Sequence, residues 1–387
     1  MNKKMTLFLA LIHCGLLFLS CKGQDVPSEI TIRNGYSLSL ATDQIKNPRF
    51  MLFGPDGTLY VSQPRQGDIK ACRDENGDGV FESIKTFVSG HKTVHDMYWH
   101  EGWLWFAESG AVFKAQDTNG DGVADKTETI LAKGSLPEGG GHWHRPVLIM
   151  NSRLYTGIGC SGNLTEEGDT DRMKIWTYDL SGRDKQLFAS GLRNTEKLVI
   201  RPGTEEIWGM DHGSDWFGGT MEKKNGGTGQ PITDMNPFGE MNHIVAGAFY
   251  GHPYITGFRV PRYEFMDRDD IVALAEKTTV PEWGTGAHWA PNAMAFYDGE
   301  QFPDDVRGDA FVAFHGSWNR SEKSGYCVSR VLFDQGKPYG ELVYVNFISS
   351  DGSVLGRPVD VINAPDGSLL ISDDQKSKIY RLSYGGK

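Results

Sequence analysis

One pattern of hydrophobic and polar positions recurs along the chain. An apolar stretch with period-two alternation is followed by a turn and by a second alternating stretch rich in Tyr, Trp and Ile. The copies read MLFGPDGTLYVSQP from Met51, DMYWHEGWLWFAES from Asp96, VLIMNSRLYTGIG from Val147, LVIRPGTEEIWGMDHG from Leu198, MAFYDGEQFPDDVRGDAFVAFHG from Met294 and VINAPDGSLLISDD from Val361. Alternation around Pro-Asp-Gly or Asp-Gly turns predicts antiparallel hairpins with one buried face.

The spacing of these copies predicts the architecture. A large residue stands in the second stretch of each copy, namely Tyr60, Trp105, Tyr155, Trp208, Phe311 and Ile371. Successive members are roughly one propeller blade apart, except across a long insertion at about 212–290. We therefore expect an all-β, six-bladed β-propeller over residues 41–387, after an N-terminal linker at 22–40. Residues 268–277 are expected to form one short helix.

Composition and charge agree with such a fold and narrow the function. The chain has 48 Gly and 11% aromatic residues, which supply the turns and the large side chains that short packed strands need. The formal net charge of −11 argues against a nucleic-acid partner, because phosphate binding needs clustered Lys and Arg.

The N-terminus resembles a targeting signal. Lys3 and Lys4 precede an apolar segment from Leu7 to Leu19, and Ser20 stands directly before Cys21. This pattern predicts a lipoprotein signal peptide at 1–21 and a lipidated Cys21, which would anchor the protein to a membrane in the periplasm or at the cell surface. The alternative is an ordinary cleaved signal with an incidental Cys21; both predict export.

The cysteines exclude two classes of site. Apart from Cys14 and Cys21, only Cys72, Cys160 and Cys327 occur, too few for a disulfide framework, although one pair could form. No CxxC or CxxCH motif occurs, so neither a zinc ribbon nor a c-type haem is encoded.

Two acidic segments have the spacing of calcium-binding loops. Both place oxygen-bearing side chains at positions 1, 3, 5 and 9 with Gly at position 6, as hard cations require. The residues are Asp74, Asn76, Asp78 and Glu82 in the first loop and Asp117, Asn119, Asp121 and Asp125 in the second. We expect structural calcium sites at the propeller rim; the alternative is that DxNGDG only makes a good turn.

Four polar clusters at the ends of the copies are candidates for chemistry on the central channel. They are GGGHWHR at 139–145, GLRN at 191–194, HGSWNR at 315–320 and GRP at 356–358. His142 offers an imidazole that can accept a proton, although a satisfied structural histidine is the alternative. Arg193, Arg320 and Arg357 come from different blades and predict an anionic ligand such as a polycarboxylate, unless they form salt bridges between blades.

The ordered set of motifs carries a family resemblance. GGGHWHR, GLRNTEKL, WGMDHGSDWFG, PFGEMNHIVAGAFYGHPY, HWAPNAMAFYDGEQFP, FVAFHGSWNRSEKSGY and GRPVDVINAPDGSLLISDDQKSKIYRLSY resemble the L-sorbosone dehydrogenase branch of the soluble quinoprotein glucose/sorbosone dehydrogenase family. The resemblance covers about residues 30–384. It implies a six-bladed propeller that binds pyrroloquinoline quinone and calcium in its central cleft and oxidises sugars.

The resemblance also implies roles for individual residues. His142 matches the general base that takes the proton from the sugar C1 hydroxyl while a hydride passes to the quinone. Arg193 and Asn194 match residues that contact the quinone, with Arg193 placed to stabilise the reduced oxygen. Arg320 and Arg357 stand where the family places basic residues on the carboxylates of the cofactor.

The calcium ligands and the departures from the family need separate mention. Gly213 and Ser214 lie in the loop whose backbone carbonyls bind the calcium of the cofactor, although the glucose-oxidising relatives have another residue in place of Ser214. Those relatives follow Arg-Asn with Pro and Gln, whereas Thr195 and Glu196 follow here, which places an acid near the quinone. His144 is a second candidate for the base.

Three functions remain open from the sequence. The first is a quinone-dependent dehydrogenase that oxidises an aldose or sugar aldehyde and passes electrons to a periplasmic acceptor. The second is a calcium-dependent lactonase, since propellers also carry such hydrolases. The third is a non-catalytic surface propeller that binds glycans or proteins through Trp216, Phe217 and Trp289.

Overall fold

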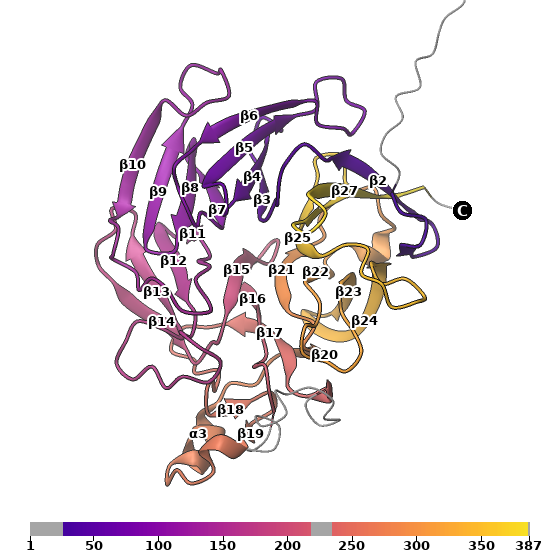
Figure 1. Ribbon diagram of the computed structural model, residues 1–387. Coiled ribbons are helices and arrows are strands. Elements are labelled where there is room, and N and C mark those ends of the chain that lie inside the picture. Colours follow the sequence, from indigo (N-terminus) through magenta and orange to yellow (C-terminus); the bar gives the residue numbers. More distant parts are fainter. Residues whose placement is uncertain (1–25, 218–233, 386–387) are drawn as a thin grey trace, which may run out of the picture.

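The computed structural model describes residues 26–217 and 234–385, and its main sheets surround a central axis (Figure 1). Each blade is an antiparallel sheet. The blades are β3 (Met51–Phe53), β4 (Leu59–Gln63), β5 (Asp68–Arg73) and β6 (Ser83–Val88); β7 (Met97–His100), β8 (Trp103–Glu108), β9 (Ala111–Gln116) and β10 (Lys126–Leu131); β11 (Leu148–Met150), β12 (Arg153–Ile158), β13 (Lys174–Asp179) and β14 (Gln186–Ser190); β15 (Thr195–Ile200), β16 (Ile207–Asp211), β17 (Phe238–Ile244) and β20 (Trp283–Ala287); β21 (Pro291–Phe296), β22 (Ala310–Phe314), β23 (Cys327–Asp334) and β24 (Lys337–Asn346); and β25 (Pro358–Asn363), β26 (Leu369–Asp373) and β27 (Lys378–Tyr384). The prediction of an all-β, six-bladed propeller is confirmed.

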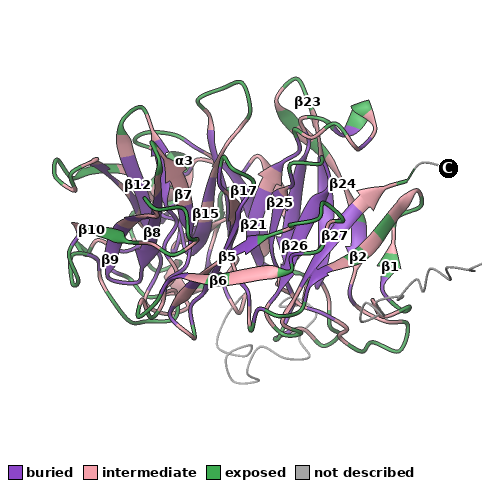
Figure 2. Ribbon diagram, turned by 90° about the horizontal axis from the view of Figure 1, so that it is seen from above, coloured by how far each residue is buried: buried purple, intermediate pink, exposed green. Residues whose placement is uncertain are grey.

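The repeated pattern forms the first two strands of every blade. The six large residues that marked it all lie in the second strand, and all are buried. Six hydrophobic clusters fill the six interfaces between neighbouring blades. Figure 2 shows the consequence: the strands of the ring are largely buried, and exposed residues gather in the loops.

The N-terminal strand closes the ring. β2 (Tyr36–Thr42) pairs with β27, with Tyr36 opposite Tyr384 and Leu38 opposite Leu382, and completes the last blade (Figure 1). β1 (Thr31–Ile32) pairs with β24 at the outer edge of the fifth blade. The expected linker at 22–40 is therefore wrong over these two strands, because their partners stand at the far end of the chain. The predicted signal peptide at 1–21 lies outside the described residues.

Residues 212–290 contribute both to the fourth blade and to an excursion from it. They supply β17 and β20, and between these strands lie β18 (Ile255–Thr256), β19 (Val260–Pro261), the 3-10 turn η1 (Tyr263–Phe265) and α3 (Ile271–Lys277). α3 lies within the predicted helix at 268–277. Within the described ranges, no helix is long and apolar enough to cross a membrane.

Antiparallel order assigns each loop to one of two faces. In every blade the first strand begins, and the second strand ends, on the same face of the ring. The four predicted polar clusters all stand at such positions. The two acidic loops follow the third strands β5 and β9, and therefore lie on the opposite face.

The three described cysteines form no disulfide. Cys72, Cys160 and Cys327 are buried free thiols. Burial raises the pKa of the Cys72 and Cys327 thiols to about 12, so both are held in the unreactive thiol form.

Trp208 tests the packing between the fourth and fifth blades. It is 1% exposed and lies edge-on to Phe296 and Phe333. We expect Trp208→Ala to lower the free energy of unfolding by about 3–5 kcal/mol, because the cavity cannot collapse between two sheets. Val272→Ala, on the exposed face of α3, should change it by less than about 0.5 kcal/mol. Urea unfolding followed by circular dichroism measures both; equal losses would contradict the packing role.

Glu240 makes the stability of the fold decrease as the pH rises. Burial and the neighbouring Asp211 raise the pKa of Glu240 from 4.5 to about 7, and its Oε1 accepts the Gly257 amide at 2.8 Å. Because the folded protein binds this proton more tightly than the unfolded chain does, the protonated Glu240 contributes to the free energy of unfolding. This contribution is complete below pH 4.5 and is lost as the pH rises to about 7.

Glu240→Gln removes this titration and keeps an oxygen for the Gly257 amide. We expect the difference in the free energy of unfolding, variant minus wild type, to increase by about 3 kcal/mol between pH 4.5 and pH 7. Unfolding in urea across this range measures the gain. Glu205→Gln, at an exposed position, is the control; a gain of the same size there would contradict the assignment.

Candidate active site

The predicted polar clusters meet on one face of the ring, around the axis. His142 precedes β11, Arg193 and Asn194 precede β15, Arg320 follows β22, and Arg357 precedes β25. Asn319 donates from its side chain to the Asp215 carbonyl, which brings the loop after β22 against the loop after β16. Four blades thus contribute to one site.

His142 is held in a defined tautomer. Its Nδ1 lies 2.8 Å from the Cys160 carbonyl oxygen. Because a carbonyl only accepts hydrogen bonds, Nδ1 carries the proton and Nε2 keeps a free lone pair. Burial and the cation of Arg193 lower the pKa of His142 to about 3, so the ring is neutral near pH 7. Such a group can accept a proton from a ligand.

Arg145 positions the loop that carries both histidines. Its side chain is fully buried and donates to the carbonyls of Ser109, Pro137, His142 and His144 at 2.6–3.0 Å. The sequence placed Arg145 in the motif but gave no sign of this positioning role.

A buried carboxylate fixes the GLRN segment. Asp211 accepts the amides of Arg193 (2.8 Å) and Asn194 (2.7 Å) and the hydroxyl of Thr195 (2.9 Å). The Arg193 carbonyl accepts the Cys160 amide at 2.8 Å. Cys160 therefore connects the two predicted catalytic residues, since its carbonyl binds His142.

The guanidinium of Arg193 already has an anionic partner. It lies 3.2 Å from Asp215 Oδ1 and 3.0 Å from the Gly213 carbonyl, and it also bonds Asn163. The side chain of Asp215 is about one-third exposed. An anionic ligand at Arg193 would therefore replace a carboxylate of the protein itself.

Arg320 and Arg357 bond backbone carbonyls, and the nearest effects on carboxylates are that Arg320 lowers the pKa of Asp234 and Arg357 that of Asp374. Arg320 donates to the Ala287 carbonyl at 3.3 Å and Arg357 to the His315 carbonyl at 3.1 Å. Neither forms an ion pair within the part of the chain that the structure describes, and the buried Nε of Arg320 has no hydrogen-bond partner there. Two cations that form no close ion pair among the described residues are suited to a ligand with carboxylates.

The space beside these residues is narrow. A cavity of about 60 Å³ is lined by Arg193, His212, Asp215, His288 and Asn319, and a second of about 20 Å³ lies beside it, against Ser214. A tricyclic ligand needs ~300 Å³ or more. The cationic donors around this space suit a ligand with carboxylates, and a ligand of that size needs more room than these two cavities offer.

Gly213 and Ser214, predicted to hold the calcium of the cofactor, are engaged in other bonds. The Gly213 carbonyl accepts from Arg193, and the Ser214 hydroxyl accepts from Arg262 at 2.5 Å and donates to the Trp216 carbonyl at 3.0 Å. Calcium at the Gly213 carbonyl would share this oxygen with the guanidinium of Arg193, and this ligand set stays a prediction.

The two acidic loops are ordered by their own backbone. Asp74 accepts the amides of Gly77 and Gly79, and Asp117 accepts those of Gly120 and Gly122, all at 2.7–2.8 Å. Similar backbone amide bonds are accepted by the side-chain oxygens of Asn76, Asp78, Asn119 and Asp121. In the first loop, oxygens of Asp74, Asp78 and Glu82 lie within 4.8 Å of one another, whereas Asp125 of the second bonds Thr118. Calcium binding here stays a prediction.

Glu196 does not present a free acid to the site. It is buried, with Arg49 at 2.9 Å, His144 at 3.0 Å and Asn194 at 3.1 Å. His144 is thereby committed to a carboxylate, whereas Nε2 of His142 is not. Of the two candidate bases, the geometry favours His142.

Sequence reasoning missed several residues of the axis, including Arg49, His95, His212, His288 and Asp374. Arg49 and His95 stand just before first strands, as Arg193 and Arg357 do. An alignment of the six copies at their first strands would have revealed Arg49 and His95.

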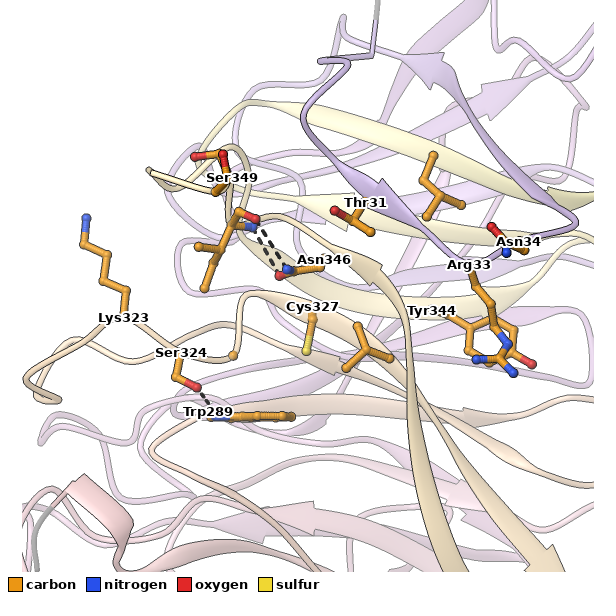
Figure 3. Close-up of a pocket in the computed structure, with 15 residues that line it drawn as sticks. Thr31, Arg33, Asn34, Trp289, Lys323, Ser324, Cys327, Tyr344, Asn346 and Ser349 are labelled. Carbon is orange, nitrogen blue, oxygen red and sulfur yellow. Dashed lines mark hydrogen bonds between the residues drawn. The ribbon is translucent and has the colours of Figure 1, made fainter. Parts of the chain in front are cut away.

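A separate cleft of about 890 Å³ lies beside the fifth blade (Figure 3). Figure 3 shows Trp289, whose Nε1 donates to Ser324 Oγ at 2.7 Å, and Arg33, which lies 5.2 Å from the Tyr344 ring centroid. None of the residues predicted to hold the cofactor or a metal lines this cleft.

Comparisons with known proteins give the family. The chain is 25% identical over 384 residues to an uncharacterized protein of Borreliella burgdorferi, covering 95% of this chain and 94% of that protein. Its fold matches the calcium structure of a Trichoderma reesei family AA12 enzyme (TM-score 0.79, 17% identity, 94% and 100% of the two chains). It also matches the holo form of the pyranose dehydrogenase PQQ domain from Coprinopsis cinerea (TM-score 0.77, 17% identity, 94% and 99%). The sequence profile of the TrAA12-like family matches residues 30–385, the whole propeller, and the chain therefore belongs to the TrAA12-like family.

Proposed function

We propose that this protein is a pyrroloquinoline quinone-dependent dehydrogenase that oxidises an aldose or sugar aldehyde of the glucose or sorbosone type. The observation that carries the proposal is the position of His142, whose unprotonated Nε2 accepts no hydrogen bond from the described residues and lies near the cation of Arg193. Membership of the TrAA12-like family and the likeness in fold to a PQQ domain support it. The L-sorbosone dehydrogenase branch is part of this proposal and rests on the motifs alone.

The residues of the chain divide into holding and reacting groups. Arg320 and Arg357 would hold carboxylates of the quinone, and Arg193 and Asn194 would contact its ring system. Calcium at the carbonyls of Gly213 and Ser214 would complete the site. When bound, the quinone supplies the hydride acceptor.

His142 would act on the sugar hydroxyl. Nε2 accepts the proton, while the bond from Nδ1 to the Cys160 carbonyl keeps the ring in place. Arg193 would offset the negative charge that builds up at the site. The same cation holds the pKa of His142 low, so an anionic ligand at Arg193 would make His142 a stronger base.

The mouth of the site carries aromatic surface suited to a sugar. Trp216 and Trp318 lie edge-to-face with centroids 5.3 Å apart, and Trp318 is 63% exposed. Exposed rings offer apolar faces on which a sugar ring can stack. These exposed rings would also suit glycan binding without catalysis. Such a function would give no role to His142 or to the arginines Arg320 and Arg357.

A lactonase is the weaker alternative. It needs several oxygen ligands that together bind calcium on the axis, whereas Asp360 there is paired with Lys197 at 2.7 Å and Asp374 with Arg49 at 3.0 Å. We further propose export, lipid anchoring through Cys21 and electron transfer to a periplasmic acceptor, all on the sequence alone.

His142→Ala tests the base directly. With calcium and pyrroloquinoline quinone supplied, we expect sugar-dependent turnover to fall by at least about 100-fold, because the proton has no acceptor. Quinone affinity, measured by titration, should change little. His100→Ala, at the opposite end of a first strand, should keep full turnover. Unchanged turnover in His142→Ala would overturn the assignment.

Arg320→Ala tests the anion site. Loss of a cation that forms no close ion pair among the described residues should weaken quinone binding by at least about tenfold, or about 1.4 kcal/mol, as measured by titration calorimetry. Arg307→Ala, with a side chain 53% exposed away from the axis, is the control and should bind as the wild type does. Equal affinity in both variants would place the quinone elsewhere.

A further inference from the structure

A cluster of two histidines and one glutamate lies on the axis of the ring, apart from the predicted calcium ligands. His95 precedes β7, His144 precedes β11, and Glu196 lies in β15, so three successive blades contribute one side chain each. One ligand atom from each of them lies within 4.8 Å of the other two. None of the roles proposed above uses His95.

The ring nitrogens of His95 form no hydrogen bond with the described residues. The side chain is fully buried. The ring packs between Phe50 and His144, with centroid distances of 4.0 and 4.1 Å, so packing holds it in place. Burying unpaired polar atoms costs about 1–3 kcal/mol each, which a ligand at Nε2 would offset.

The spacing of the atoms fits a metal ion with nitrogen and oxygen ligands. His144 Nδ1 lies 3.0 Å from Glu196 Oε1, and His95 Nε2 lies 3.5 Å from Glu196 Oε2. Ligands on an ion with bonds of ~2.0–2.1 Å stand about 3.3 Å apart in a tetrahedron. The three side chains could therefore hold an ion after small shifts.

The carboxylates around the cluster outnumber the cations that pair with them, so a net negative charge remains for a metal ion. Arg49 binds Glu196 at 2.9 Å, but it also binds Asp374 at 3.0 Å. One guanidinium thus faces two carboxylates, and His315 bonds the far oxygen of Asp374 at 3.1 Å. Asn194, which bonds Glu196, is uncharged. Lys197, whose charge also acts on His95, is paired with Asp360 at 2.7 Å.

We propose that His95, His144 and Glu196 bind one divalent first-row transition-metal ion, such as zinc, on the propeller axis. Two imidazole nitrogens and one carboxylate suit such an ion, whereas calcium takes oxygen ligands. Solvent completes its coordination. The ion ties three blades together and is distinct from the calcium proposed at Gly213 and Ser214.

The test uses metal alone, without quinone or sugar. The purified chain is stripped with a chelator, and zinc binding is measured by calorimetry and elemental analysis with calcium in excess. We expect one zinc per chain. Cobalt in place of zinc should give a visible d–d absorption typical of nitrogen and oxygen ligation.

Two variants and a matched control locate the ion. His95→Ala and Glu196→Gln should each weaken zinc binding by more than about 100-fold, because even residues that only support ligands contribute 10–100-fold. His91→Ala is the control, since His91 also bonds a glutamate, Glu108, at 2.8 Å, but away from the cluster. It should bind zinc as the wild type does.

Each outcome decides the proposal. Binding lost in the two variants and kept in the control supports it. Absence of zinc binding and of the cobalt spectrum in the wild type overturns it, as does binding that survives both substitutions. If His95→Ala fails to fold, as seen by circular dichroism, the nearly isosteric Glu196→Gln and the cobalt spectrum of the wild type still decide. No readout depends on activity, so the quinone proposal can fail independently.

Discussion

The pairing of β2 with β27 is the constraint on which the rest of the structure depends. A ring of blades closes only if its last blade is joined to the start of the chain, and here Tyr36–Thr42 supply the outer strand of that blade. Closure brings the last blade against the first and fills that interface with apolar side chains from both. Only a closed ring has an axis on which loops from six blades can meet.

That axis collects charged and polar side chains that no single blade could bury. Arg49, Lys197, Glu196, Asp360 and Asp374 are buried or nearly so, and each has an opposite charge from another blade. A buried charge is tolerated only when it is paired, so these contacts demand that several blades are present together. The site is therefore a property of the whole ring.

Partners, rather than residue types, separate the roles of the axial histidines. His142 bonds a backbone carbonyl and keeps a free Nε2, His144 bonds Glu196, and His95 has no partner among the described residues. The first arrangement suits proton transfer, whereas the other two suit a ligand held between blades. Arg145, which binds the carbonyls of both His142 and His144, maintains the difference.

The sequence by itself determined the fold class, the number of blades, the short helix at α3 and the four motifs that lie on one face. These follow from local rules, since alternation, turn residues and strand order act over a few residues. Only the tertiary structure decided that Tyr36–Thr42 belong to the last blade, that Asp215 pairs with Arg193, and that Glu196 contacts Arg49 and His144. Those contacts join residues from different blades or loops, and their distances are set by the closure of the ring, which no local pattern encodes.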